Sequence, residues 1–177
     1  FPNSGWSFTS DFQSYLFSSN YHNDFKPFSV VKAEFSKAFS LTNSLTFKFQ
    51  GDAGLPIGND GIPFFNFVLG GYGYNGINNF KPFFGYDFLS VAANSFIKAS
   101  GTIDCVFLKK NHLNFSANFA NLEQNLFQSK DWISLPKYSG YAVGYGLETI
   151  IGPIEVKYSW SPENSRGFTW FSVGFWF

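Results

Sequence analysis

The chain has 177 residues, enough for one domain, and its 12 basic and 12 acidic residues leave a formal net charge of zero. Aromatic residues make up 23% and charged residues 14%, which excludes a disordered chain and gives no sign of a nucleic-acid-binding surface. No stretch reaches the roughly 20 consecutive apolar residues that a membrane-spanning helix needs. Many aromatic residues without such a helix are typical of strands that alternate lipid-facing and polar residues.

Alternation of apolar and polar residues with a period of two marks eight strands along the chain. Each has one apolar face and one polar or small face. The expected strands are 6–17, 28–39, 44–53, 95–108, 112–120, 140–151, 154–161 and 167–177. In the last strand the side expected to face lipid carries Phe171, Val173, Phe175 and Phe177.

The connections between these strands alternate in length. Three are short, at 40–43, 109–111 and 152–153, and four are longer, at 18–27, 54–94, 121–139 and 162–167. Short turns on one side and long loops on the other are typical of antiparallel transmembrane β-barrels in the bacterial outer membrane, with the short turns periplasmic. The sequence therefore predicts an all-β barrel that contacts outer-membrane lipid and has a periplasmic C-terminus.

The charged residues on the polar faces permit two interpretations. They could line a conducting path, or they could pair with one another across strands and fill the interior. Because both signs are mixed, we expect pairing. These residues are Asp11, Lys32, Glu34, Lys48, Asp52, Lys98, Asp104, Glu148, Glu155 and Lys157.

The residues that most often carry chemistry form no recognisable site. His22 lies beside Asp24 in a loop and is expected to be solvated, and His112 at a turn is given no role. Cys105 is the only cysteine, so no intrachain disulfide forms, and its place in the alternation predicts a small lipid-facing residue. We expect no metal site, no cofactor and no catalytic residue, since a Gly-x-Ser-x-Gly nucleophile motif does not occur.

Three segments together resemble the C-terminal barrel half of the bacterial surface antigen superfamily, which includes outer-membrane assembly factors and two-partner secretion transporters. They are Phe1–Gly5, Phe67–Gly71 and Gly152–Ile154 followed by a strand. The resemblance implies that residues 1–177 are the C-terminal eight strands of a sixteen-stranded barrel. It also implies that the last strand, through Phe171, Val173, Phe175 and Phe177, carries the signal read by the barrel assembly machinery.

The loop 54–94 is too long to be only a connection. By resemblance it is the superfamily's sixth loop, with Gly70 and Gly71 leading into it, and it folds into the lumen; the alternative is an extracellular loop that contacts a partner. The superfamily usually has Arg-Gly-Phe or Arg-Gly-Tyr there, with the arginine paired to an acidic residue. Here the stretch reads Phe84-Gly85-Tyr86 and the facing strand offers Asn118, so both charges are absent together.

The segments Gly140–Thr149 and Gly152–Pro162 resemble the end of patatin-like phospholipases that carry such a barrel. This implies a barrel that anchors or translocates, with a lipid hydrolase domain elsewhere in a longer chain. The turn-like start Phe1–Gly5 favours a fragment, whose partner would be missing N-terminal strands or another outer-membrane protein. Two alternatives stay open: a stand-alone small barrel with an adhesive or structural role, and a barrel-embedded lipid-modifying enzyme that uses His22.

Overall fold

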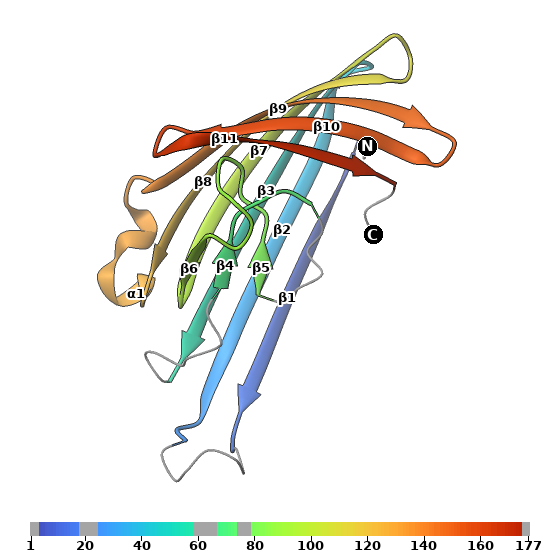
Figure 1. Cartoon of the computed structure of the whole chain (residues 1–177). Coiled ribbons are helices and arrows are strands. Elements are labelled where there is room, and N and C mark those ends of the chain that lie inside the picture. The colour runs from blue at the N-terminus through green and yellow to red at the C-terminus, as the bar shows by residue number, and fades with distance from the viewer. Residues whose placement is uncertain (1–3, 18–24, 59–66, 74–78, 175–177) are drawn as a thin grey trace.

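A computed structural model describes residues 4–17, 25–58, 67–73 and 79–174. Eight long strands form one antiparallel sheet in the order β1-β2-β3-β7-β8-β9-β10-β11 (Figure 1). Their bounds are Gly5–Tyr15 (β1), Phe28–Thr42 (β2), Leu45–Ile57 (β3), Ser95–Phe107 (β7), Asn111–Glu123 (β8), Tyr138–Thr149 (β9), Gly152–Ser161 (β10) and Asn164–Val173 (β11). Within the described residues no helix is long and apolar enough to cross a membrane.

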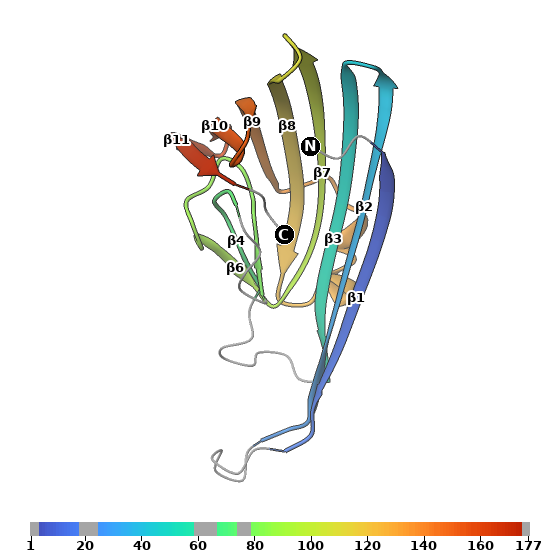
Figure 2. The ribbon, with the colours of Figure 1, turned by 90° about the vertical axis from the view of Figure 1, so that its right-hand side faces the viewer.

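The long connection between β3 and β7 has a small sheet of its own. Its strands are β4 (Phe67–Leu69), β5 (Phe80–Lys81) and β6 (Val91–Ala93), in the order β5-β4-β6. Figure 2 shows β4 and β6 on the concave side of the large sheet. A short helix, α1 (Leu126–Ser129), and a 3-10 turn, η1 (Asp131–Ile133), lie in the connection between β8 and β9.

The two faces of the large sheet differ as the alternation predicts. On the convex face large apolar side chains are exposed, among them Phe8, Phe12, Phe115 and Phe171. On the concave face polar side chains such as Thr46, Asp52, Asn118 and Ser159 are buried. Since successive side chains of a strand point to opposite sides, one register sets both faces along every strand.

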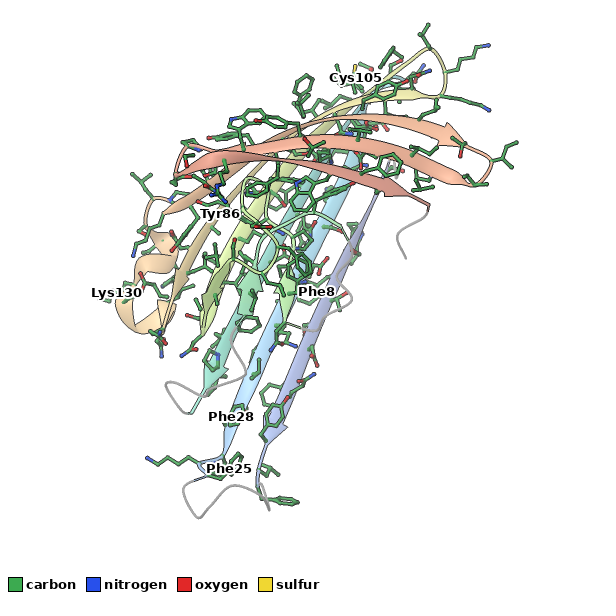
Figure 3. The ribbon with its side chains drawn as sticks, in the orientation of Figure 1. Phe8, Phe25, Phe28, Tyr86, Cys105 and Lys130 are labelled. Atoms are coloured by element: carbon green, nitrogen blue, oxygen red, sulfur yellow. The ribbon has the colours of Figure 1, made fainter. Side chains whose placement is uncertain are left out.

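The apolar core lies between the concave face and the loop rather than between two sheets. Its members come from β2, from the loop strands and from β7 and β8: Phe28, Val30, Phe67, Leu69, Phe83, Tyr86, Ala93, Phe96, Ala120 and Leu122. In Figure 3 Phe28 and Tyr86 mark positions on this inner side, far apart along the sheet. The loop is therefore packed as part of the fold.

Several strand boundaries differ from the sequence-based expectation; β2 runs to Thr42 rather than 39, and β8 to Glu123 rather than 120. The third strand does not end at residue 53 but continues to Ile57, because Gly54 is not a break there; a Cβ on it would lie 2.5 Å from the Phe67 ring, so glycine makes room for the loop core. The last strand begins at Asn164 and not at 167. The connection 162–167, expected to be long, is a tight turn of Pro162 and Glu163, stabilised by the Ser161 hydroxyl that accepts from the Glu163 amide at 3.1 Å.

The sheet is open. β1 pairs with β2 only and β11 pairs with β10 only, so among the described residues these two strands do not pair with each other. The turns β2–β3, β7–β8 and β9–β10 lie at one end of the sheet, the end at which β1 begins and β11 finishes (Figure 1). The β10–β11 turn is as short as these but lies at the opposite end, so the expected alternation of connection lengths does not hold there.

Candidate functional site: a loop fastened inside the curved sheet

The structure brings the two loop motifs singled out in the sequence together. The Gly71 amide donates to the Tyr86 carbonyl at 2.9 Å, and the Phe83 amide donates to the Gly71 carbonyl at 3.1 Å. Gly70 has φ +139°, and a Cβ there would lie 2.0 Å from the Asp87 carbonyl oxygen. Glycine is thus required where the two halves of the loop cross closely.

Phe84 fastens the loop to β8 and β9. Its backbone amide donates a 2.7 Å hydrogen bond to Oδ1 of Asn118. Its carbonyl oxygen lies 1.9 Å from where a Cβ of Gly140 would be, so only glycine on β9 admits this approach. Phe84 occupies the position at which the superfamily usually has an arginine. A neutral hydrogen bond holds it there, and its partner, Asn118, is the residue that the resemblance placed opposite it.

Gly85 lies directly against β10 and the start of β11. It has φ +81°, and a Cβ on it would lie 2.5 Å from the Trp160 carbonyl carbon and oxygen. Its own carbonyl accepts from Nδ2 of Asn164 at 3.2 Å. The tight turn between β10 and β11 is part of this contact, because it brings Asn164 to the loop.

Tyr86 reaches the same turn with its side chain, on the inner side of the sheet (Figure 3). Its hydroxyl donates to Glu163 at 3.3 Å and accepts from Ser161 at 3.3 Å, and its ring lies edge-on to Tyr138. Burial raises the pKa of Tyr86, and the Glu163 charge adds to this rise, against the lowering effect of the Ser161 hydrogen bond. For Glu163, burial opposes ionisation, but hydrogen bonds from Ser161 and Ser139 outweigh it and lower the pKa.

Lys81 fastens the loop on the opposite side, to β2 and β3. Its Nζ lies 2.7 Å from Oε2 of Glu34 and 3.4 Å from Oδ1 of Asp52. Asp52 is fully buried and also pairs with Lys98 on β7 at 2.8 Å. Burial alone would lower the pKa of Lys81, but the Glu34 hydrogen bond and the Asp52 charge outweigh it and raise the pKa. The ammonium therefore stays charged between two carboxylates.

A third contact joins the glycine-rich part of the loop to β10. The Tyr72 hydroxyl donates to Glu155, and the ammonium of Lys157 lies 4.7 Å from the Tyr72 ring centroid and 5.2 Å from that of Phe84. Glu155 also pairs with Lys157 at 3.2 Å and accepts from Asn114 at 2.6 Å. The cation between two aromatic faces is held by cation–π attraction, which strengthens away from water.

Most of the charges expected on the concave face pair with a group of opposite charge. Lys32 on β2 lies 3.7 Å from Asp11 on β1, and Lys98 on β7 lies 2.8 Å from Asp52 on β3, whereas Lys157 and Glu155 pair within β10. His112, which was given no role, is buried between Asp104 at 2.9 Å from Nδ1 and Glu148 at 3.2 Å from Nε2. It bridges β7, β8 and β9 near the short-turn end.

The sequence reasoning missed Lys81, Tyr72, Glu163 and His112. The sequence does contain a hint for Lys81. It is the only basic residue in the stretch 54–94 and stands among aromatic residues, which would favour an acidic partner. The alternation also gave a hint for His112, because it is one of the residues of its strand whose side chains point to the concave face. Its partners in the neighbouring strands are Val106 and Gly146. Glu163 had no signal, since its role depends on a turn that the alternation placed elsewhere.

The remaining predicted site residues lie on the outside or beyond the described residues. Phe171 and Val173 are exposed on the convex face of β11. Phe175, Phe177 and His22 lie outside the described residues. Cys105 is partly exposed on β7, and the described residues contain no cluster of histidine, cysteine and carboxylate groups fit for a metal ion.

Comparisons with known proteins agree with this geometry. The family model of the OMP85 superfamily matches residues 1–177. A crystal structure of BamA from Haemophilus ducreyi lacking POTRA domains 1–3 matches with a TM-score of 0.65 and 17% identity over 98% of this chain. The chain spans 39% of the length of that structure, and no curated protein sequence matches.

The match over the whole chain and the exposed apolar convex face together establish the type of protein. The sheet is part of an antiparallel transmembrane β-barrel of the bacterial outer membrane, with lipid on the convex side and the loop on the lumen side. The chain belongs to the OMP85 superfamily.

Proposed function

We propose that these residues form the C-terminal part of the wall of an OMP85-type barrel, which acts as a membrane anchor or as a translocation barrel for the rest of the protein. The loop is a fixed element inside this barrel. One observation carries the proposal: the loop is fastened to both flanks of the sheet. Lys81 pairs with β2 and β3, while Phe84 and Tyr86 bond to β8 and to the β10–β11 turn. A loop held in this way braces the curvature of the wall.

The open edges support a wall that other strands complete. In hydrocarbon each unpaired backbone amide or carbonyl costs several kcal/mol, so an open edge is not tolerated. The unpaired outward edges of β1 and β11 thus support pairing with strands beyond these eight. We propose that those strands are N-terminal ones of the same protein, giving sixteen; another outer-membrane protein is the alternative.

Size and assembly in membranes test this proposal. The full-length protein and residues 1–177 alone would be expressed with an export signal and extracted from outer membranes without boiling. We expect the full-length protein to run as a compact, heat-modifiable monomer and residues 1–177 alone to be degraded or to aggregate. A monomeric, heat-modifiable species near 20.0 kDa would contradict the proposal and favour a stand-alone barrel.

The orientation needs a separate test. We propose that the short turns and the C-terminus are periplasmic. Single cysteines at Ser44, in a short turn, and at Ser129, at the opposite end, are both exposed, and Cys105→Ala provides the background. A membrane-impermeant maleimide applied to intact cells should label the Ser129 position and not the Ser44 position; the reverse pattern would overturn the orientation.

A second, more specific proposal concerns the enzymatic activity of the parent protein. The residues of β9 and β10 that resemble patatin-like phospholipases suggest a lipid hydrolase domain in the parent protein. The parent protein should then hydrolyse phospholipid esters, and the activity should persist when the lumen contact is weakened by Asn118→Ala. Absence of a Gly-x-Ser-x-Gly motif from the rest of the protein would eliminate this proposal.

A further inference from the structure

Two short turns at the same end of the sheet form a single exposed patch with an unusual composition. The β7–β8 turn contains Leu108, Lys109 and Lys110, and the β9–β10 turn contains Ile150 and Ile151. We call these five residues the turn patch. Leu108 is 79% exposed, Ile150 102% and Ile151 70%, and both lysines are exposed. Large aliphatic side chains so far in the open need a partner.

The backbones of the two turns are joined. The Glu148 amide donates to the Lys110 carbonyl at 2.9 Å, which ties one turn to the other. Behind it, the buried His112 bridges Asp104 and the half-exposed Glu148, so the strand ends that carry both turns are also joined by side-chain contacts. The two turns are thus held side by side.

The β7–β8 turn also has an unfavourable backbone for its residues. Leu108 has φ +51° and Lys109 has φ +63°, a region that asparagine and glycine adopt at much lower cost. The leucine and the lysine hold their side chains at the tip of the turn at this backbone cost.

The surroundings identify the partner as lipid. The outer face directly beside the turns is apolar, since Phe107 and Tyr145 pack together there with ring centroids 6.3 Å apart, and this face meets the membrane in an OMP85 barrel. The turn patch continues that face toward the headgroups. Its charges are both positive, while the nearby Glu148 carboxylate is engaged by His112. Anionic headgroups would meet the lysines and acyl chains would meet the aliphatic residues.

We propose that the turn patch binds anionic glycerophospholipid of the leaflet on the short-turn side, with Leu108, Ile150 and Ile151 inserted among the acyl chains and Lys109 and Lys110 on the phosphates. This goes beyond the proposed function and rests only on the position of the wall in the membrane. Its failure would leave the anchoring function and the loop contacts untouched.

The occupant can be captured directly. A photo-crosslinking amino acid at Ile150 of the full-length protein, irradiated in cells, should yield adducts with the mass of a phospholipid. The same residue at Ser129, at the other end, should not show this selectivity. A dominant cross-link to a protein, or to lipopolysaccharide, would overturn the proposal.

Affinity provides the second test. Native mass spectrometry of the full-length protein with added phosphatidylglycerol should show binding that Lys109→Gln/Lys110→Gln weakens by roughly 30-fold, since each lysine near an anionic surface contributes about fivefold. The matched control Lys26→Gln/Lys130→Gln removes two exposed lysines from the opposite end and should leave the affinity unchanged. Leu108→Asn keeps both lysines and relieves the backbone, so it should weaken lipid binding without lowering thermal stability. Equal affinity in the lysine double variant and wild type would refute the site.

Discussion

The backbone amide of Phe84 donates a 2.7 Å hydrogen bond to Oδ1 of Asn118, which joins the tip of the inner loop to the wall of the barrel. The superfamily usually has an arginine paired with an acidic residue at this place. Here an uncharged contact does the same task, and the neighbouring cation is Lys157, already held by Glu155 and two aromatic rings.

Replacing the neutral contact by a charged pair tests whether residues 84 and 118 join the loop to the wall. Asn118→Asp alone buries an uncompensated carboxylate and should cost about 3–5 kcal/mol of unfolding free energy. Phe84→Arg alone should also destabilise, because it loses the aromatic contact and adds a cation near Lys157. Measured by urea titration of the full-length protein in vesicles, the double variant should be more stable than the sum of the two changes. Strict additivity would mean that the two side chains do not meet.

Removal of the Lys81 ammonium should loosen the loop on the β2–β3 side. Lys81→Gln leaves Glu34 without this partner, while Asp52 keeps Lys98, so we expect a loss of about 1–3 kcal/mol. Limited proteolysis should cut the loop faster in Lys81→Gln than in wild type. Lys26→Gln, which removes an exposed lysine just before β2, is the matched control and should behave as wild type.

The Lys81 contact also has a defined pH dependence. Because the folded-state pKa of Lys81 is raised above its ordinary value of 10.5, its stabilisation is complete below that value and is lost as the pH rises through the folded pKa. The difference in stability between wild type and Lys81→Gln should be constant from about pH 7 to pH 9 and shrink only above the ordinary lysine value. A difference that already falls between pH 7 and pH 9 would contradict the assignment.

Gly85 should not tolerate a side chain. Gly85→Ala adds a Cβ 2.5 Å from the Trp160 carbonyl in a positive-φ conformation, so the loop must leave β10 or the strand must shift. Gly5→Ala imposes a comparable backbone penalty at φ +123° with nothing within 4 Å, and is the control. We expect the first change to cost more than the roughly 1 kcal/mol of the second and to raise proteolysis of the loop. Similar behaviour of both variants would show that Gly85 is not packed against β10.

The last strand should carry the assembly signal on its lipid face. Phe171→Asn and Phe115→Asn each place an amide on an exposed outer position, on β11 and β8 respectively, at a similar cost in lipid. If β11 is read by the assembly machinery, only Phe171→Asn should reduce the amount of protein in the outer membrane, while both variants fold alike in detergent. An equal loss of both variants from the outer membrane would show that Phe171 is not part of the assembly signal.

The alternation of apolar and polar residues predicted the eight wall strands, their faces and the barrel fold, because side-chain period and burial are local properties of the chain. It placed strand ends poorly where glycine and proline occur inside a strand, as at Gly54 and Pro56, since the reason for those residues is the loop that packs against them. The partners of Lys81 and Glu163 could not be derived, because they depend on which strands lie side by side across the curved sheet. Phe84 and Asn118 were identified by resemblance, but only the structure joins them by a hydrogen bond.

Hydrogen exchange at the amide of Phe84, measured residue by residue in the full-length protein in lipid bilayers, tests the fastened inner loop most directly. The hydrogen bond to Asn118 predicts strong protection in wild type and rapid exchange in Asn118→Ala, with the Gly71 amide, bonded within the loop to Tyr86, changing less. An amide of Phe84 that exchanges as fast in wild type as in Asn118→Ala would contradict a loop held against the lumen wall.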